Sequence, residues 1–99
     1  SMKFSIDFDY SKTMRQVETL RSISSELSDV GKNQFEDCMD DVSKNWKCDN
    51  SKKYINKGDK LKGYIVDSSS DILKAADALE RIAANLYNAE KRNTLIAKK

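Results

Sequence analysis

The sequence predicts an all-α protein in which two long antiparallel helices form a helical hairpin that pairs into a four-helix bundle. The 99 residues form one expected domain, 1–99, and include no proline and only three glycines, which favours helices. Apolar residues recur at steps of three and four on both sides of a polar turn near the midpoint. The apolar stripe of the second half is wider than a two-helix seam, so a second helical pair is expected to cover it.

The first half of the chain is expected to form a lead-in and one long helix. Residues 1–10 alternate apolar and polar side chains, which taken alone is the pattern of a strand. Because a lone strand has no partner, we expect an extended lead-in that packs on a helix. Ser11 is a good N-cap, and the first helix is predicted over 11–45. Its apolar spacing slips near Gly31, which resembles a stutter and is expected to loosen the helix there.

The second half is expected to form a turn over 46–50, a long helix over 51–94 and a frayed tail over 95–99. From Tyr54 to Ala89 the apolar and small residues alternate steps of four and three, which is an a/d heptad pattern. The large side chains of this predicted helix-pairing seam are Leu61, Ile65, Ile72, Leu79, Ile82 and Leu86.

Charge is distributed unevenly along the chain. Residues 1–45 hold six basic and nine acidic side chains, whereas residues 46–99 hold twelve and seven. The acidic cluster before the turn is Glu36, Asp37, Asp40 and Asp41, and the basic cluster after it is Lys47, Lys52, Lys53 and Lys57. If the chain folds back at the turn, the two clusters face each other. Exposed pairs stabilise by only about 0–1 kcal/mol each, but their signs favour antiparallel pairing.

Several classes of function find no support in the composition. There is no histidine, and two cysteines are too few for a disulfide framework or a zinc site, so we expect free cysteines, no metal, no cofactor and no catalytic residue. No apolar run approaches the roughly 18 residues of a membrane span, so we expect no membrane insertion. Residues 1–20 form no continuous apolar block, so we expect no signal peptide and export, if any, by another route.

The arrangement resembles the WXG (ESAT-like) family of small helical proteins exported by type VII secretion systems, over almost the whole chain. Trp46, Lys47 and Cys48 stand where that family has Trp-x-Gly in its turn, with cysteine in place of glycine. Tyr87 and Glu90 resemble the family's export signal, Tyr-x-x-x-Asp/Glu, although the spacing here is three residues.

The resemblance implies a non-catalytic protein of a Gram-positive bacterium, cytoplasmic before export and then secreted or at the cell surface. Its implied partners are a second copy or a homologous helical protein, and the secretion machinery. In that family the turn tryptophan and the tail motif form a composite export signal after dimerisation. The alternative is a targeting partner of an LXG-type toxin, which binds the toxin's helical N-terminal domain. The sequences of such targeting partners diverge from Trp-x-Gly, so cysteine at position 48 favours this alternative.

The same residues have simpler interpretations. Trp46 can act only as a plug that closes the hairpin end, and Tyr87 and Glu90 can be ordinary helix surface. A DNA-binding hairpin is the alternative of another class, because lysines interleave with aromatic residues after the turn. Asp49 and Asp59 interrupt that run, so we expect a solvated pairing face and no nucleic-acid binding. The lysines concerned are Lys47, Lys52, Lys53, Lys57, Lys60 and Lys62.

Overall fold

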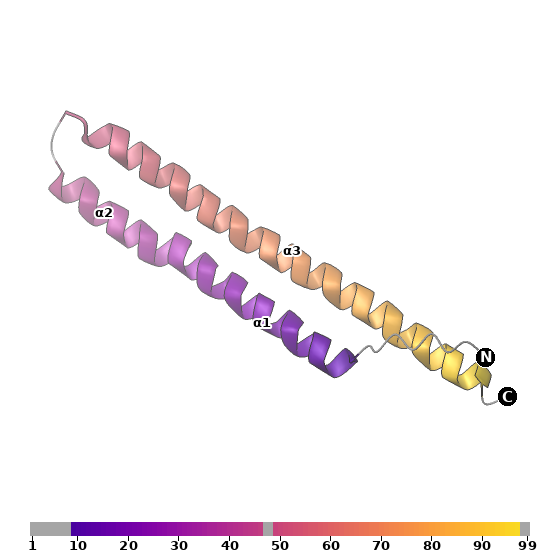
Figure 1. Ribbon diagram of the computed structural model, residues 1–99. Helices are drawn as coiled ribbons and strands as arrows, with labels where there is room; N and C mark the ends of the chain where they lie inside the picture. Colours follow the sequence, from indigo (N-terminus) through magenta and orange to yellow (C-terminus); the bar gives the residue numbers. More distant parts are fainter. Residues whose placement is uncertain (1–8, 47–48, 98–99) are drawn as a thin grey trace.

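The computed structural model describes residues 9–46 and 49–97, and within these ranges it contains helices and no strand (Figure 1). The predicted all-α class is therefore confirmed. The elements are α1 (Tyr10–Asp29), a π-helical turn η1 (Val30–Gln34), α2 (Phe35–Asn45) and α3 (Ser51–Ala97). The molecule is elongated, with extents of 78 × 17 × 14 Å.

The long helix α3 lies alongside α1 and α2 (Figure 1). Near one end the ring of Tyr10 stacks on that of Tyr87, with 4.6 Å between the centroids. Further along, Ser24 Oγ donates a 2.7 Å hydrogen bond to the carbonyl oxygen of Ser69. Beyond η1, Met39 lies against Gly58. Residues of the first half therefore meet those of the second in reverse order.

The helix ends differ from the prediction by a few residues. The N-cap of α1 is Asp9 and not Ser11, because the Asp9 carboxylate accepts a 2.9 Å hydrogen bond from the Lys12 backbone N–H. The extended lead-in predicted over 1–10 therefore ends by Asp9, and its residues 1–8 lie outside the described part. At the other end, α3 continues to Ala97, three residues past the predicted end, because no glycine or proline stops it.

The slip in apolar spacing near Gly31 coincides with the π-helical turn, which inserts one extra residue into the helix. The reason for the glycine differs from the prediction. Gly31 is buried, and a Cβ added there would lie 2.9 Å from Ile65 Cγ2 and 3.0 Å from Val66 Cγ2. Gly31 therefore allows a close approach of α3 rather than loosening its own helix.

The line of contact between α1 and α3 is built from small side chains. Among the described residues the buried apolar side chains are Val17, Ala76 and Ala83, and the buried polar ones are Ser24 and Ser69. On each helix these positions follow seven-residue steps, as expected where two long helices pack along one line. Val17 is the largest of the described side chains that is fully buried, so residues 9–46 and 49–97 by themselves enclose a very small core.

Gly63 offers a test of the exposed side of α3. A Cβ added there would meet no atom within 4 Å, so Gly63→Ala should gain helix propensity without a clash. We expect the free energy of unfolding to rise by about 0.5–1 kcal/mol. Urea denaturation followed by circular dichroism measures this change. A decrease would show that position 63 is in close contact with another surface in solution.

Candidate interaction surfaces

Each buried position separates two flanks of the molecule, because successive helical residues lie about 100° apart around the axis. The residues that directly follow buried positions lie on one flank. Ser25 follows Ser24, Lys32 follows Gly31, and these two residues line an open groove with an internal volume of about 700 Å³. We call this side the polar flank.

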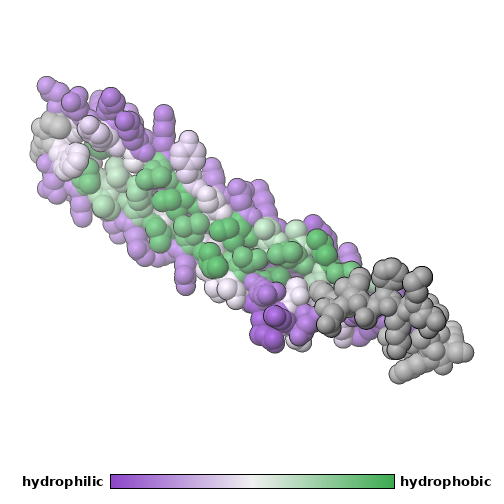
Figure 2. Space-filling model, in the orientation of Figure 1, coloured by the Kyte–Doolittle hydropathy of each residue, from purple (hydrophilic) through white to green (hydrophobic). Residues whose placement is uncertain are grey.

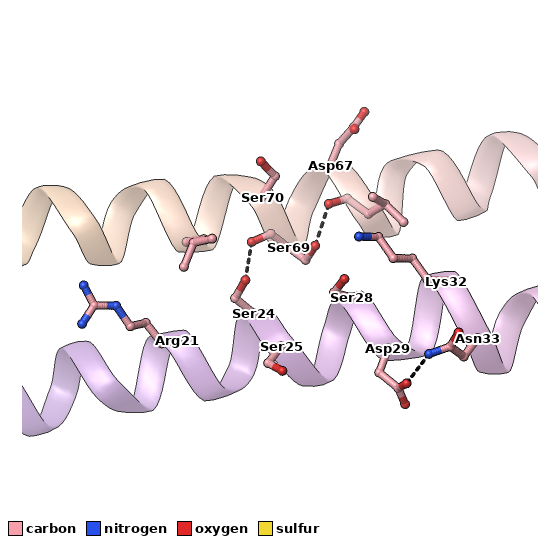
Figure 3. Close-up of a pocket in the computed structure, with 12 residues that line it drawn as sticks. Arg21, Ser24, Ser25, Ser28, Asp29, Lys32, Asn33, Asp67, Ser69 and Ser70 are labelled. Carbon is pink, nitrogen blue, oxygen red and sulfur yellow. Dashed lines mark hydrogen bonds between the residues drawn. The ribbon is translucent and has the colours of Figure 1, made fainter.

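The polar flank is rich in serine and in charged groups that are already hydrogen-bonded. Figure 3 shows its groove between α1 and α3, with the Ser24–Ser69 hydrogen bond joining the two helices. Arg21 is hydrogen-bonded to three carboxylates, of which Glu80 contributes most to raising the pKa of Arg21 above its ordinary value. The other two carboxylates belong to Glu18 and Asp77.

Asp29 lies at the end of α1 on the same flank. Its carboxylate accepts hydrogen bonds of 2.6 Å from Asn33 Nδ2 and 3.1 Å from Gln34 Nε2. These bonds favour the ionised form and lower the pKa of Asp29 below its ordinary value. The carboxylate therefore ties the end of α1 to the π-helical turn.

The residues that directly precede buried positions lie on the opposite side, which we call the apolar flank. Ile23 precedes Ser24 and Val30 precedes Gly31, while Ile82 precedes Ala83. Its large side chains are 37–52 % exposed. Figure 2 shows this side of the molecule, where hydrophobic residues (green) form a band along the rod that hydrophilic residues (purple) border. The large exposed members of the apolar flank are Ile23, Val30 and Ile82, together with Leu61 and Leu79, which lie three residues, or about 300° around the axis, past buried Gly58 and Ala76.

The predicted seam of α3 is only partly turned toward α1 and α2. Ile65, Ile72 and Leu86 are half-buried, but Leu61, Leu79 and Ile82 are exposed. Inside the chain, the line of contact instead follows the small residues Gly58, Ser69, Ala76 and Ala83. Three positions of the seam are therefore not covered by α1 and α2, because small residues allow the closest approach within the chain. Its role in pairing with another chain stays a prediction.

Trp46 is the C-cap residue that directly follows α2, and half of its surface is exposed at the turn. Its backbone N–H donates to the Val42 carbonyl, and its ring meets Tyr54 edge-on, with centroids 6.1 Å apart. The Lys57 ammonium lies 5.8 Å from the Tyr54 ring centroid. An aromatic and basic surface therefore extends from Trp46 onto α3. The other two residues of the predicted turn motif, Lys47 and Cys48, lie outside the described residues.

Tyr87 and Glu90 lie on α3 near the opposite end of the molecule, and both are exposed. Tyr87 stacks on Tyr10, and the Lys91 ammonium lies 4.7 Å from its ring centroid. One face of the predicted export residue is therefore covered by the first residue of α1. Sequence spacing could not find this contact, because Tyr10 and Tyr87 belong to separate helices.

The ion pair between the acidic cluster and α3 differs from the predicted pairing of the two charged clusters. Glu36 forms an ion pair with Lys62, which lies beyond the predicted basic cluster. Asp41 and Lys57 both remain exposed. Both lie on the side of the apolar flank. Asp41 directly precedes half-buried Val42, and Lys57 directly precedes buried Gly58.

Among the described residues, no group of histidine, cysteine, aspartate and glutamate side chains is arranged to hold a metal ion. Cys38 is an exposed free thiol on α2. No helix in the described part of the chain is both long and apolar enough to cross a membrane. Comparison with known proteins found no matching family model, no similar curated protein and no similar solved structure.

Proposed function

We propose that this chain is a non-catalytic, WXG-like helical hairpin that pairs through its apolar flank with a second helical protein into a four-helix bundle. The bundle would serve a type VII secretion system, either as a secreted substrate or as the partner that targets a larger substrate for export. The observation that carries the proposal is the apolar flank itself, on which five large aliphatic side chains of the folded chain stay 37–52 % exposed.

The exposed area of the chain supports a partner. The chain exposes 8043 Å², whereas a compact monomer of 11.3 kDa exposes about 5,700 Å². The difference is about 2,300 Å², and a standard interface buries roughly 800 Å² on each partner. The excess reflects the rod shape of the chain. A second helical pair laid along the apolar flank would cover the exposed aliphatic side chains there and would supply the core that one chain lacks.

The aromatic residues near the two ends of the rod are placed where secretion components could bind them after the bundle has formed. Trp46 with Tyr54 and Tyr87 with Glu90 lie near opposite ends of the rod, outside the central part of the apolar flank. Pairing would leave both groups accessible at the bundle ends. In the resembling family these are the places that the export machinery reads, so the proposal extends to binding of secretion components.

The proposal is tested by purifying the chain from its native host and measuring the mass of the complex by light scattering. We expect a complex with itself or with another helical protein. Co-purification of a toxin through its helical N-terminal domain would support the targeting role, whereas a homodimer that is itself exported would support the substrate role. A stable monomer that captures no helical protein would overturn the proposal.

A further inference from the structure

The open groove of the polar flank is about as long as three helical turns. Its lining residues on α1 and η1 run from Arg21 to Asn33, which corresponds to about 18 Å along the axis. A volume of about 700 Å³ over that length describes a channel roughly 6 Å across, too narrow for a whole helix of about 10 Å. The groove therefore fits the side chains along one face of a helix that lies over it.

Small and aliphatic side chains form the middle of this groove. Ser24 and Ser69 are buried there, and their hydrogen bond joins α1 to α3 (Figure 3). Ser28 is half-buried beside them, whereas Leu73 is 43 % exposed on α3. The serines let another helix approach closely, and Leu73 offers an apolar contact that the proposed bundle leaves uncovered.

Carboxylates outnumber cationic groups around the groove. At one end three carboxylates share the single charge of Arg21, which leaves an excess of two negative charges. At the other end Asp29 and Asp67 line the groove with one cation, Lys32, which extends from η1 toward α3 (Figure 3). The groove is therefore acidic, although the whole chain has a net charge of +2. This complementarity favours a cationic occupant.

The two acidic ends define the spacing that an occupant needs. Asp77 accepts a hydrogen bond from Arg21 at one end, and Asp67 lies ten residues earlier on α3, about 15 Å along the axis. Both carboxylates are exposed. Two residues of one helix that are three turns apart lie on the same face and about 16 Å from each other. A helix with basic side chains at this spacing therefore places one cation at each end of the groove.

We propose that the groove of the polar flank docks a basic helix of a partner protein. Cationic side chains of that helix bind the carboxylates at both ends of the groove, and an aliphatic side chain between them covers Leu73. The inference goes beyond the proposed function, because this surface lies opposite the apolar flank and does not depend on pairing there. A bundle formed through the apolar flank keeps the groove open, so the chain can join two different helical proteins.

A synthetic peptide tests the groove with the full chain. The probe is a labelled alanine- and glutamine-based helix of about 16 residues, with two lysines three turns apart and a leucine between them on the same face. One control peptide carries glutamate in place of both lysines, and a second carries a central proline that breaks the helix. Fluorescence anisotropy at low ionic strength measures the affinities. We expect the lysine helix to bind at least about tenfold more tightly than either control.

Substitutions in the chain assign the binding to the groove. Asp67→Asn together with Asp77→Asn should weaken binding of the lysine helix about tenfold, because two attracting charges are lost. Lys32→Gln should strengthen it about threefold, because a repelling charge is lost. The matched control is Asp37→Asn together with Asp40→Asn, which removes two exposed carboxylates of α2 outside the groove. This control should leave the affinity within about twofold.

Three results would overturn the basic helix as the occupant. The first is a lysine helix that does not bind, and the second is a proline peptide that binds equally well. The third is an equal loss of affinity in the α2 control, which would show a general attraction between opposite charges.

Two further variants separate this inference from the proposed function. Leu73→Lys should weaken binding of the peptide at least about tenfold and leave pairing intact, whereas Leu61→Lys with Ile82→Lys should weaken pairing and leave peptide binding intact. Loss of pairing in Leu73→Lys would instead show that a second copy occupies the groove, which overturns the inference. A chain that binds the peptide but pairs with no helical protein would overturn the proposed function alone.

Discussion

Replacing both Leu61 and Ile82 with lysine will weaken pairing of the chain by more than about a hundredfold. Both side chains are about half exposed and lie on the apolar flank of α3, so neither contributes much to the core of one chain. In the proposed bundle each becomes buried. Full burial of a leucine or isoleucine is worth about 1.5–3 kcal/mol, so covering the exposed half is worth roughly half of that for each side chain. Lysine removes that gain and also places an ammonium group where water is excluded.

Sedimentation or light scattering over a range of protein concentrations measures this effect, and circular dichroism verifies that the helices remain. If the partner in the host is a different protein, the amount of that protein that co-elutes with the variant measures the loss of pairing. We expect the double variant to stay separate at concentrations where the unchanged chain is fully paired.

Leu73→Lys is the matched control for this experiment. Leu73 lies on the same helix and is 43 % exposed, but it lines the groove of the polar flank. We expect its replacement to change pairing by less than about threefold, since the side chain remains exposed in the proposed bundle. An equal loss of pairing in Leu73→Lys and in the double variant would show that the apolar flank is not the interface.

The control also explains which part of the fold could be predicted from the sequence. The steps of three and four predicted the helices. The slip near Gly31 marked the place of the irregular turn but not its π-helical form. The predicted seam followed large side chains such as Leu61 and Ile82, and these turned out to be exposed. The contact inside the chain uses Ser69 and Ala76, which a pattern of hydrophobicity passes over because small residues contribute little to it.

The features at the two ends of the molecule could be predicted only where they depend on one helix and not on the alignment of two. Trp46 stood out because it is the only tryptophan, and its place at the turn followed from the helix pattern. The contact of Tyr87 with Tyr10 depends on how the two helices align, and periodicity within one helix does not fix that alignment. Asp9 and Ser11 are both good N-caps, so local propensity alone could not choose between them.

The alignment of the helices leads to the second prediction, that Gly31→Leu will destabilise the chain by about 1–3 kcal/mol. Even a Cβ at this position would lie 2.9 Å from Ile65 Cγ2 and 3.0 Å from Val66 Cγ2. Both methyl groups belong to β-branched side chains, which cannot turn away freely. The helices must therefore separate locally, which also opens the contact of Ser24 with Ser69, since Ser24 lies only about two turns from Gly31.

Gly63→Leu separates this packing cost from helix propensity. Both substitutions replace a helical glycine with leucine, and the gain in propensity is about 0.8 kcal/mol in each case. At position 63 no atom lies within 4 Å of the added Cβ, so only the gain should appear there. Urea denaturation of the two variants therefore reports the packing cost as the difference between their unfolding free energies. Equal values would mean that α3 does not lie against Gly31 in solution.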